Sequence, residues 1–306
     1  MGGPLLKILP AIAFATALLV GPAAAQDSGP VALAASSEWT LDYAEDSCAL
    51  RRSFGQGENQ AWLEMRQLVP GYRIRITVGS SAFRTRTRHP ATVRFLPDGD
   101  AATYDLTAYG DYGEDVAGVA FYAALMLSDT PDPPEFRPDG ESIVGNESTA
   151  RAIEVRHAFN RDLVLHTGDL QAPMKAMRAC MEDLMSEWGI AWSSGGAAKF
   201  RSPAPRRLQV WARPIMNSFP LGLFRLEGPS IIKVRLIIDA NGKPEACRVV
   251  EPVVDGAYEK RTCGIIMSDA QYEPALDEAG SAVRTLYVQN IVYTTQQLGK
   301  RSAPER

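Results

Sequence analysis

The stretch IIKVRLIIDANGKPEACRVVE, residues 231–251, carries the clearest secondary-structure pattern in this chain of 306 residues. Apolar and charged side chains alternate over residues 231–238, which predicts a strand with one face packed in a core. Asn241-Gly242 follows, and this dipeptide is typical of a tight hairpin because it accepts the positive φ angles of the turn. A second strand is expected from Ala246 to Glu251, so the whole stretch predicts a β-hairpin.

The residues after this hairpin predict a helix and a final strand. Residues 257–268 have the spacing of a short helix, and four apolar side chains are expected on its inner face: Tyr258, Cys263, Ile266 and Met267. Residues 272–275 contain a proline and turn the chain, and residues 283–293 read as a long strand. The expected order is strand, strand, helix, strand.

The N-terminal half shows short strand patterns separated by turn residues. Its clearest strand is residues 72–78, where apolar residues alternate with Arg73, Arg75 and Thr77. Further strand candidates are residues 39–43, 48–54, 61–67, 83–88, 91–96, 102–108, 151–157 and 161–166. Residues 116–127 are apolar and fit either a short helix or a buried strand.

One helix is expected at the end of this half, over residues 173–188. Pro173 suits the first helical turn, and Gly189 suits the C-terminal cap. An apolar stripe recurs at helical spacing and comprises Met174, Met177, Met181, Leu184 and Trp188. This stripe fits either core packing, which is the simpler interpretation, or a methionine-rich binding surface.

These patterns predict an α+β fold with two domains. The N-terminal domain is β-rich and closed by one helix, and the C-terminal domain has the order β-β-α-β. The predicted division is a signal peptide at 1–25, a flexible leader at 26–37, the β-rich domain at 38–190, a linker at 191–205, the second domain at 206–298 and a disordered tail at 299–306.

The first residues have the composition of a secretory signal peptide. Met1–Lys7 carries one positive charge, Ile8–Val20 is apolar, and Ala23-Ala24-Ala25 offers small side chains for cleavage. The alternative is an uncleaved membrane anchor, but the apolar run is near the lower length limit for a span and contains Pro10. We therefore expect cleavage near Ala25, export to the periplasm and no stable membrane insertion.

Export favours disulfides among the four cysteines. Cys247 and Cys263 are close in sequence within one small domain, which predicts one disulfide and leaves Cys48 to pair with Cys180. No cysteine spacing fits a redox or zinc motif, and His89, His157 and His166 are not spaced as bases for a cysteine nucleophile.

Composition narrows the function further. The formal net charge of −4 and the isoelectric point near 5.6 argue against a nucleic-acid binder. Acidic and glycine-rich clusters at 98–100, 111–115 and 166–169 are explained by turn chemistry as well as by a calcium site or an acid–base pair. We expect no enzyme activity, no cofactor and no metal.

The C-terminal segment resembles the C-terminal domain of the TonB family of energy transducers over residues 231–294. The similarity is carried by the order and spacing of ten residues: Asp239, Gly242, Pro244, Cys247, Val249, Cys263, Tyr272, Pro274, Ala275 and Gly280. A cysteine pair at these two places resembles one branch of the family. In that family the domain binds an extended peptide of an outer-membrane receptor by strand addition, which implies a transport-related envelope partner.

The chain departs from the family in ways that bear on function. Transducers of this type have a membrane helix and a proline-rich spacer, whereas this chain has a signal peptide and a folded domain. The turn at 251–256 and the segment at 206–229 also lack the family's usual sequences. Without an anchor the protein is not expected to energise transport, so we expect a module that binds an envelope protein or peptide.

Two surfaces are candidates for function. The resemblance implies a peptide-binding edge on the last strand, comprising Arg284, Thr285, Leu286, Tyr287, Val288, Gln289, Asn290 and Ile291. The alternatives are that this strand has only a structural role or that it forms the edge of a homodimer. The alternative surface is an arginine-rich face for an anionic envelope ligand, comprising Arg73, Arg75, Arg84, Arg86 and Arg88. Such a stripe is also typical of a solvated edge.

Overall fold

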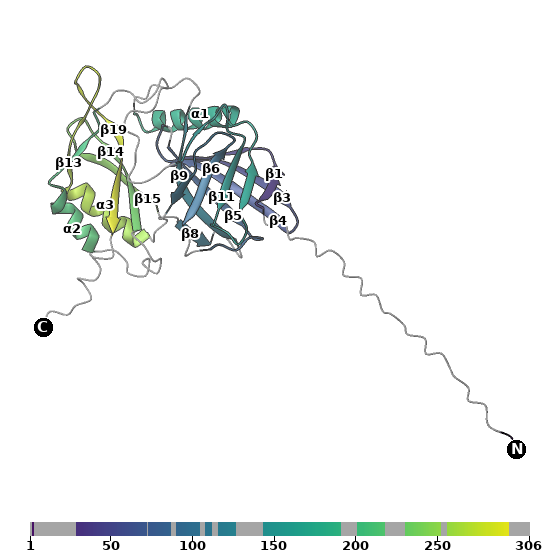
Figure 1. Cartoon of the computed structure of the whole chain (residues 1–306). Helices are drawn as coiled ribbons and strands as arrows, with labels where there is room; N and C mark the ends of the chain where they lie inside the picture. Colours follow the sequence, from purple (N-terminus) through teal and green to yellow (C-terminus); the bar gives the residue numbers. More distant parts are fainter. Residues whose placement is uncertain are drawn as a thin grey trace.

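The computed structural model describes residue 2 and residues 29–71, 73–86, 90–104, 108–111, 116–126, 143–190, 201–217, 230–251 and 256–293. Within these residues the chain is α+β, with three helices and several mixed sheets. Buried apolar side chains form two separate cores, one before and one after the segment at 191–200. Figure 1 shows the helices and strands of these two parts as two neighbouring units. Apart from Gly2, the predicted signal peptide and C-terminal tail lie outside the described residues.

The larger sheet of the N-terminal core has seven strands. Their order is β10-β9-β5-β4-β3-β2, with β8 beside β9, and only β10 runs parallel to its neighbour. The strands are β2 (Thr40–Ala44), β3 (Ser47–Gln56), β4 (Asn59–Gln67), β5 (Arg73–Ser80), β8 (Ala108–Asp111), β9 (Ala117–Met126) and β10 (Ile143–Asn146). The apolar segment at 116–127 is therefore a strand, since β9 pairs with β5 along eight residues.

The second sheet of this core has five strands in the order β1-β12-β11-β6-β7. They are β1 (Val31–Ala34), β6 (Ala91–Leu96), β7 (Ala102–Tyr104), β11 (Ala152–Arg156) and β12 (Leu163–His166). The prediction of a flexible leader at 26–37 is wrong for β1, which pairs in parallel with β12 and buries Leu33. Four residues were too few to show an alternating pattern.

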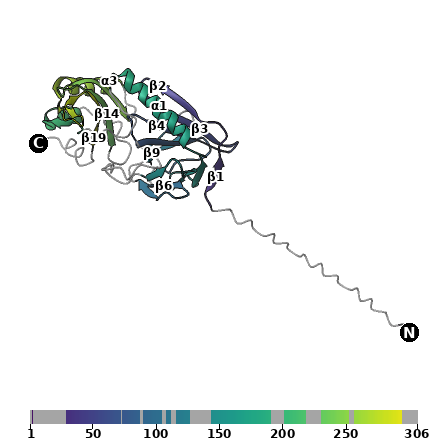
Figure 2. The ribbon, with the colours of Figure 1, turned by 90° about the horizontal axis from the view of Figure 1, so that it is seen from above.

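Helix α1 (Gln171–Glu187) closes the N-terminal core. Figure 2 shows it from above, running across the part of the large sheet that contains β2 and β3. Its methionine stripe is buried in the core, which confirms the core-packing interpretation. Cys180 on this helix is bonded to Cys48 on β3, as predicted.

The C-terminal core has the predicted β-β-α-β order. Strand β14 (Ser230–Ile238) is the centre of an antiparallel sheet between β15 (Pro244–Glu251) and β19 (Thr285–Tyr293). Helix α3 (Gly256–Asp269) packs on β15, and helix α2 (Leu208–Asn217) packs on α3. The predicted disulfide between Cys247 and Cys263 ties β15 to α3.

Two small strand pairs complete the C-terminal core and correct one boundary. They are β13 (Ala204–Arg206) with β16 (Gln271–Glu273), and β17 (Ala275–Leu276) with β18 (Ala282–Val283). The prediction of a linker at 191–205 is wrong for its last residues, because β13 pairs with β16 and Arg201 exchanges two backbone hydrogen bonds with Leu276. Prolines at 203 and 205 suggested a loop, yet a short edge strand tolerates proline.

The hairpin between β14 and β15 forms where Asn-Gly predicted it. The Asp239 carboxylate accepts hydrogen bonds from the backbone N–H groups of Asn241 and Lys243, at 2.8 and 2.7 Å. Only Gly242, and not Asn241, has a positive φ angle, 81°. A Cβ at Gly242 would lie 1.9 Å from the carbonyl oxygen of Tyr272, so close packing also requires glycine there.

Candidate functional site

Strand β19 lies at an edge of the C-terminal sheet. It pairs with β14 along its full length, from Thr285 opposite Ile238 to Tyr293 opposite Ser230. In the described part of the chain no other strand pairs with it. An edge strand of nine residues presents backbone N–H and C=O groups along one side that an added strand can pair with.

The side chains of β19 anchor the strand to its own core. Ile291 is buried, and Tyr287 packs edge-to-face on Tyr272 with ring centroids 5.6 Å apart. Burial raises the pKa of Tyr287, as expected for a phenol enclosed in an apolar core. Leu286, Val288 and Asn290 belong to the opposite face, in agreement with the predicted alternation. The strand is therefore held in place by one face.

Arg284, the first residue of the predicted edge, connects the two cores. Its guanidinium donates a hydrogen bond to the backbone carbonyl of Trp188, at the end of α1, and forms an ion pair of 2.6 Å with Glu245. A Cβ added at Gly189 would lie 3.3 Å from this guanidinium. Arg284 is thus a contact between the domains rather than part of a free edge.

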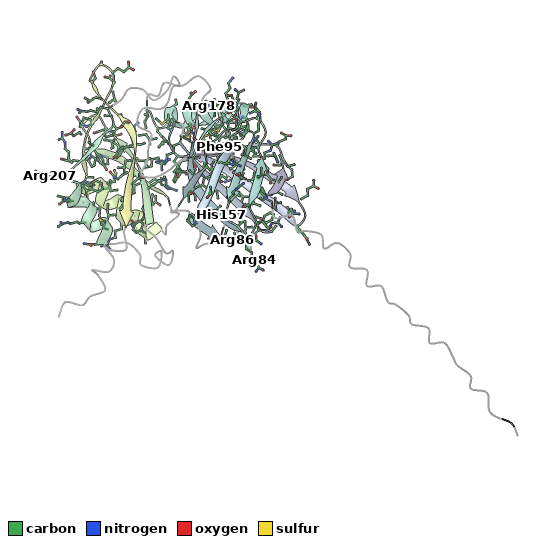
Figure 3. All side chains as sticks on the ribbon, in the orientation of Figure 1. Arg84, Arg86, Phe95, His157, Arg178 and Arg207 are labelled. Carbon is green, nitrogen blue, oxygen red and sulfur yellow. A yellow bond between two sulfur atoms is a disulfide. The ribbon has the colours of Figure 1, made fainter. Side chains whose placement is uncertain are left out.

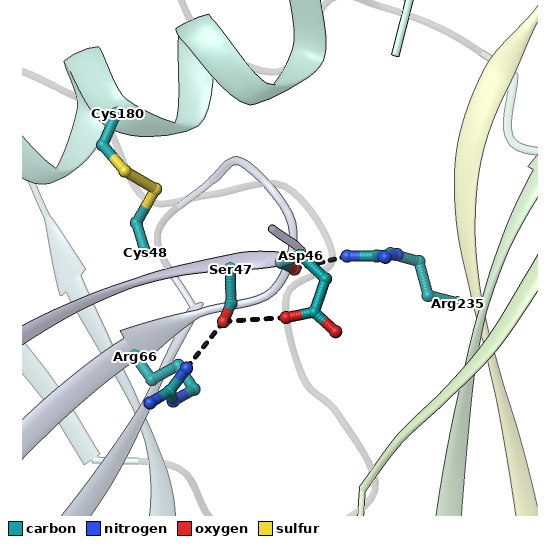
Figure 4. Close-up of a disulfide and its surroundings, with 6 residues drawn as sticks. All are labelled: Asp46, Ser47, Cys48, Arg66, Cys180 and Arg235. Carbon is teal, nitrogen blue, oxygen red and sulfur yellow. Dashed lines mark hydrogen bonds between the residues drawn. A yellow bond between two sulfur atoms is a disulfide. The ribbon is translucent and has the colours of Figure 1, made fainter. Parts of the chain in front are cut away.

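Arg235 makes a second contact of this kind on the outer face of β14. Its guanidinium lies over the Trp188 ring, 4.4 Å from the centroid, and donates a hydrogen bond to the backbone carbonyl of Asp46 (Figure 4). Arg248 lies 3.6 Å from the Asp46 carboxylate. Burial lowers the pKa of Arg235, although the charge of Asp46 opposes this effect. The loop between β2 and β3 therefore docks on β14.

A third contact is centred on Tyr122 of β9. The Nζ atom of Lys233 lies 2.9 Å from the centroid of this ring, and the Arg73 guanidinium lies 4.3 Å from it. Lys233 is buried, and this desolvation, together with the charges of Arg73 and Arg75, lowers its pKa to about 6. Two basic residues, one from each domain, therefore lie over one aromatic ring, and the charge of Arg75 also acts on Lys233.

The predicted arginine-rich face is divided in the structure. Arg73 and Arg75 lie at the domain contact near Lys233, whereas residues 83–86 form no strand. Thr85 makes only an isolated bridge to Phe159, and Arg86 donates a hydrogen bond of 3.1 Å to the backbone carbonyl of Asn160. Figure 3 shows Arg84 and Arg86 at the lower end of the N-terminal domain. The prediction of a strand at 83–88 is wrong for the described residues, and Arg88 lies outside them.

Another part of the same sheet face is neutralised by acidic residues. Glu64 on β4 accepts hydrogen bonds from Arg51 and Arg66, and Arg51 also pairs with Asp42. Burial raises the pKa of the Glu64 carboxyl, but the hydrogen bonds and charges of the two arginines outweigh it and lower the pKa. Arg66 also donates to the Ser47 hydroxyl (Figure 4). These charges form a structural network.

Sequence reasoning assigned no role to Lys233, Arg235, Trp188 or Tyr122 in joining the domains. The alternation of charged and apolar residues in β14 predicted one packed and one solvated face, as is common in antiparallel sheets. Nothing in this pattern indicated that another domain covers the charged face, and the aromatic partners carried no signal of their role either.

Comparisons with known proteins give no relative: no family model, curated protein or solved structure matches this chain. No helix among the described residues is long and apolar enough to span a membrane. The two disulfides are consistent with an oxidising compartment outside the cytoplasm.

Proposed function

We propose that this is an exported periplasmic protein that binds an extended segment of a protein partner by strand addition to β19. The observation that carries the proposal is the position of β19: a nine-residue strand, fixed by its inner side chains, at the edge of a sheet. Main-chain pairing supplies affinity in this mode, and pockets for alternate side chains supply specificity. The TonB-like residue pattern in the same segment supports the same partner chemistry.

The proposal separates binding from energy transduction. The sequence predicts a secretory signal cleaved near Ala25, and a folded domain precedes the TonB-like segment at the place where the family has a spacer. A partner segment of an outer-membrane or periplasmic protein fits this arrangement. Binding of an anionic ligand through five arginines receives less support, since Arg73 and Arg75 lie at the domain contact with Lys233.

Photo-crosslinking in cells that express the protein tests this proposal. A photoreactive residue at Asn290, which is exposed on β19, is expected to give a discrete adduct with one envelope protein. The matched control is the same residue at Ala246, which is exposed on β15 at the opposite edge of the sheet. Equal adducts at both positions, self-adducts alone or no adduct would contradict binding at β19.

Two neighbouring proline substitutions sharpen the test. In an antiparallel sheet, successive residues of an edge strand direct their N–H groups alternately towards the neighbour and towards the free edge. One of Val288→Pro and Gln289→Pro therefore destabilises pairing with β14, and the other removes a donor from the free edge only. The variant that keeps its stability is expected to lose the adduct.

The dependence of adduct formation on salt separates strand addition from binding driven by arginine. Adduct formation by strand addition is expected to survive roughly 0.5–1 M salt, at which charge interactions are screened.

A further inference from the structure

A second candidate site lies in the N-terminal domain, far in sequence from β19. It is an open pocket of about 430 Å³ at the hairpin between β3 and β4, where the end of β5 and the start of β9 also contribute. Pockets of about 300–1,000 Å³ ordinarily hold small organic ligands. The volume of this pocket lies in the lower part of that range.

The aromatic wall of the pocket is Trp62 on β4. On the outer face of the large sheet, Trp62 stands opposite Ser53 on one side and Gly79 on the other, and Gly79 stands opposite Gly118. The indole lies directly over Gly79, because a Cβ there would come within 2.3–2.5 Å of its Cε2, Cζ2 and Nε1 atoms. The missing side chain at Gly79 therefore leaves the space that the indole occupies on the sheet.

The polar wall consists of uncharged side chains. Five of the residues that line the pocket have hydroxyl or amide side chains: Ser36, Ser53, Gln56, Gln60 and Ser81. These five residues are exposed, and no hydrogen bond in the described part of the chain uses their side chains. None of the twelve described residues that line the pocket carries a charge.

Hydrogen bonds connect the backbone segments around the pocket. The Ser80 hydroxyl donates to the carbonyl of Gln60 at 2.5 Å and accepts from the N–H groups of Ala82 and Phe83 at 2.9 and 3.0 Å. The Ser36 N–H donates to the Ser53 carbonyl, so the chain before β2 is fixed to β3. The walls are therefore held in place before any ligand arrives, which reduces the entropy lost on binding.

We propose that this pocket binds a neutral carbohydrate. A sugar ring has an apolar C–H face that fits an indole, and hydroxyls that both donate and accept hydrogen bonds, as serine hydroxyls and glutamine amides do. Phosphates and carboxylates are recognised by basic side chains, and the described walls contain none. This inference is independent of strand addition at β19.

Titration of the purified full chain with neutral disaccharides tests the inference. Cellobiose, maltose and N,N′-diacetylchitobiose serve as probes, with galacturonic acid and glucose 6-phosphate as anionic comparisons. At least one neutral disaccharide is expected to shift the indole N–H resonance of Trp62 saturably, and the anions are expected to bind more weakly. Absence of binding by every neutral sugar, or tighter binding of the anions, would overturn the proposal.

Three variants locate the binding. Trp62→Ala is expected to weaken binding by about tenfold, because an aromatic stacking surface is lost. Gly79→Ala keeps every polar group but displaces the indole, so it is expected to have a similar effect. Gln56→Ala alters an exposed position and tests the polar wall even if Trp62→Ala does not fold. The matched control is Trp39→Phe, because Trp39 packs near Arg52 and does not line the pocket. Unchanged affinity in the first three variants would overturn the assignment.

Discussion

The two cores of the molecule are enclosed to different extents. The N-terminal core lies between two sheets and beneath α1, so both sheets contribute buried side chains to one cluster. The C-terminal core is built on one three-stranded sheet, with helices α2 and α3 and two short strand pairs around it. The outer face of β14 lies against the N-terminal domain through Lys233 and Arg235. The smaller core thus depends on its neighbour for cover on one side, and that cover is cationic and aromatic rather than aliphatic.

The largest predicted effect concerns the disulfides, one in each core. Cys48–Cys180 spans 132 residues, and Cys247–Cys263 spans 16. In the chain-entropy model, removing these links costs about 5 and about 3 kcal/mol. We expect C48A/C180A to destabilise the N-terminal core more than C247A/C263A destabilises the C-terminal core. Hydrogen exchange read by mass spectrometry reports each core separately.

The control for this comparison is the wild-type protein under reducing conditions, which should lose both contributions. A larger loss of stability in C247A/C263A than in C48A/C180A would mean that the smaller core depends on its disulfide more than the entropy of closing a short loop explains. This core has fewer buried side chains. That result would reverse the comparison, because the sheet and two helices would then supply too little stability on their own.

The next effect concerns the cationic cover of the smaller core and depends on pH. The pKa of Lys233 falls from its ordinary value of 10.5 to about 6 in the folded protein. Between these values the unfolded chain holds a proton that the folded chain lacks, so stability rises as the pH rises through the window from 6 to 10.5. Lys233→Met removes the titration. We expect it to be more stable than wild type at pH 7, with an advantage that shrinks by about 1 kcal/mol per pH unit towards pH 10.

Urea denaturation at pH 7, 8 and 9 measures this difference, with Lys260→Met as the control at an exposed position on α3. The control is expected to run parallel to wild type at every pH. If Lys233→Met also runs parallel to wild type, the ammonium group is as well solvated in the folded protein as in the unfolded chain, and the cover is not desolvated.

The alternating patterns predicted most of the regular strands. Residues 91–96 match β6, and the hairpin, helix and last strand of the C-terminal core lie where the sequence indicated them. Both disulfides followed from the number and spacing of cysteines together with the expected compartment. These features depend on local spacing, which is visible in a single sequence.

The features that were missed depend on distant partners. Strand β1 is short and gains its stability from β12, some 130 residues later, and α2 gains its stability by burying Trp211 against Tyr272. The spacing of Trp211 and Ile215 was a signal for α2 that Pro214 obscured. Residues 83–88 alternate in sequence as a strand should, but in the described part, residues 83–86, Thr85 makes only an isolated bridge to Phe159 and Arg86 donates a hydrogen bond to Asn160. The edge position of β19 required the sheet order, and the Trp62 pocket required both the register and Gly79.

The smallest predicted effect concerns the docking of the two cores through Arg235. Its guanidinium stacks on Trp188 and donates to the Asp46 carbonyl, contacts that together are worth about 1–2 kcal/mol. Arg235→Ala should loosen the docking while both cores stay folded. Arg235→Lys should recover only part of the effect, since an ammonium cannot stack as a planar group. Small-angle X-ray scattering is expected to show a larger radius of gyration for Arg235→Ala, with an unchanged circular dichroism spectrum. The control is Arg206→Ala, which changes a residue of β13 on the far side of the small core and should leave the scattering curve unchanged. If Arg235→Ala also leaves the curve unchanged, the prediction is wrong. The contacts of Lys233 and Arg284 then suffice to hold the two domains together, and the interface is distributed over several cationic residues.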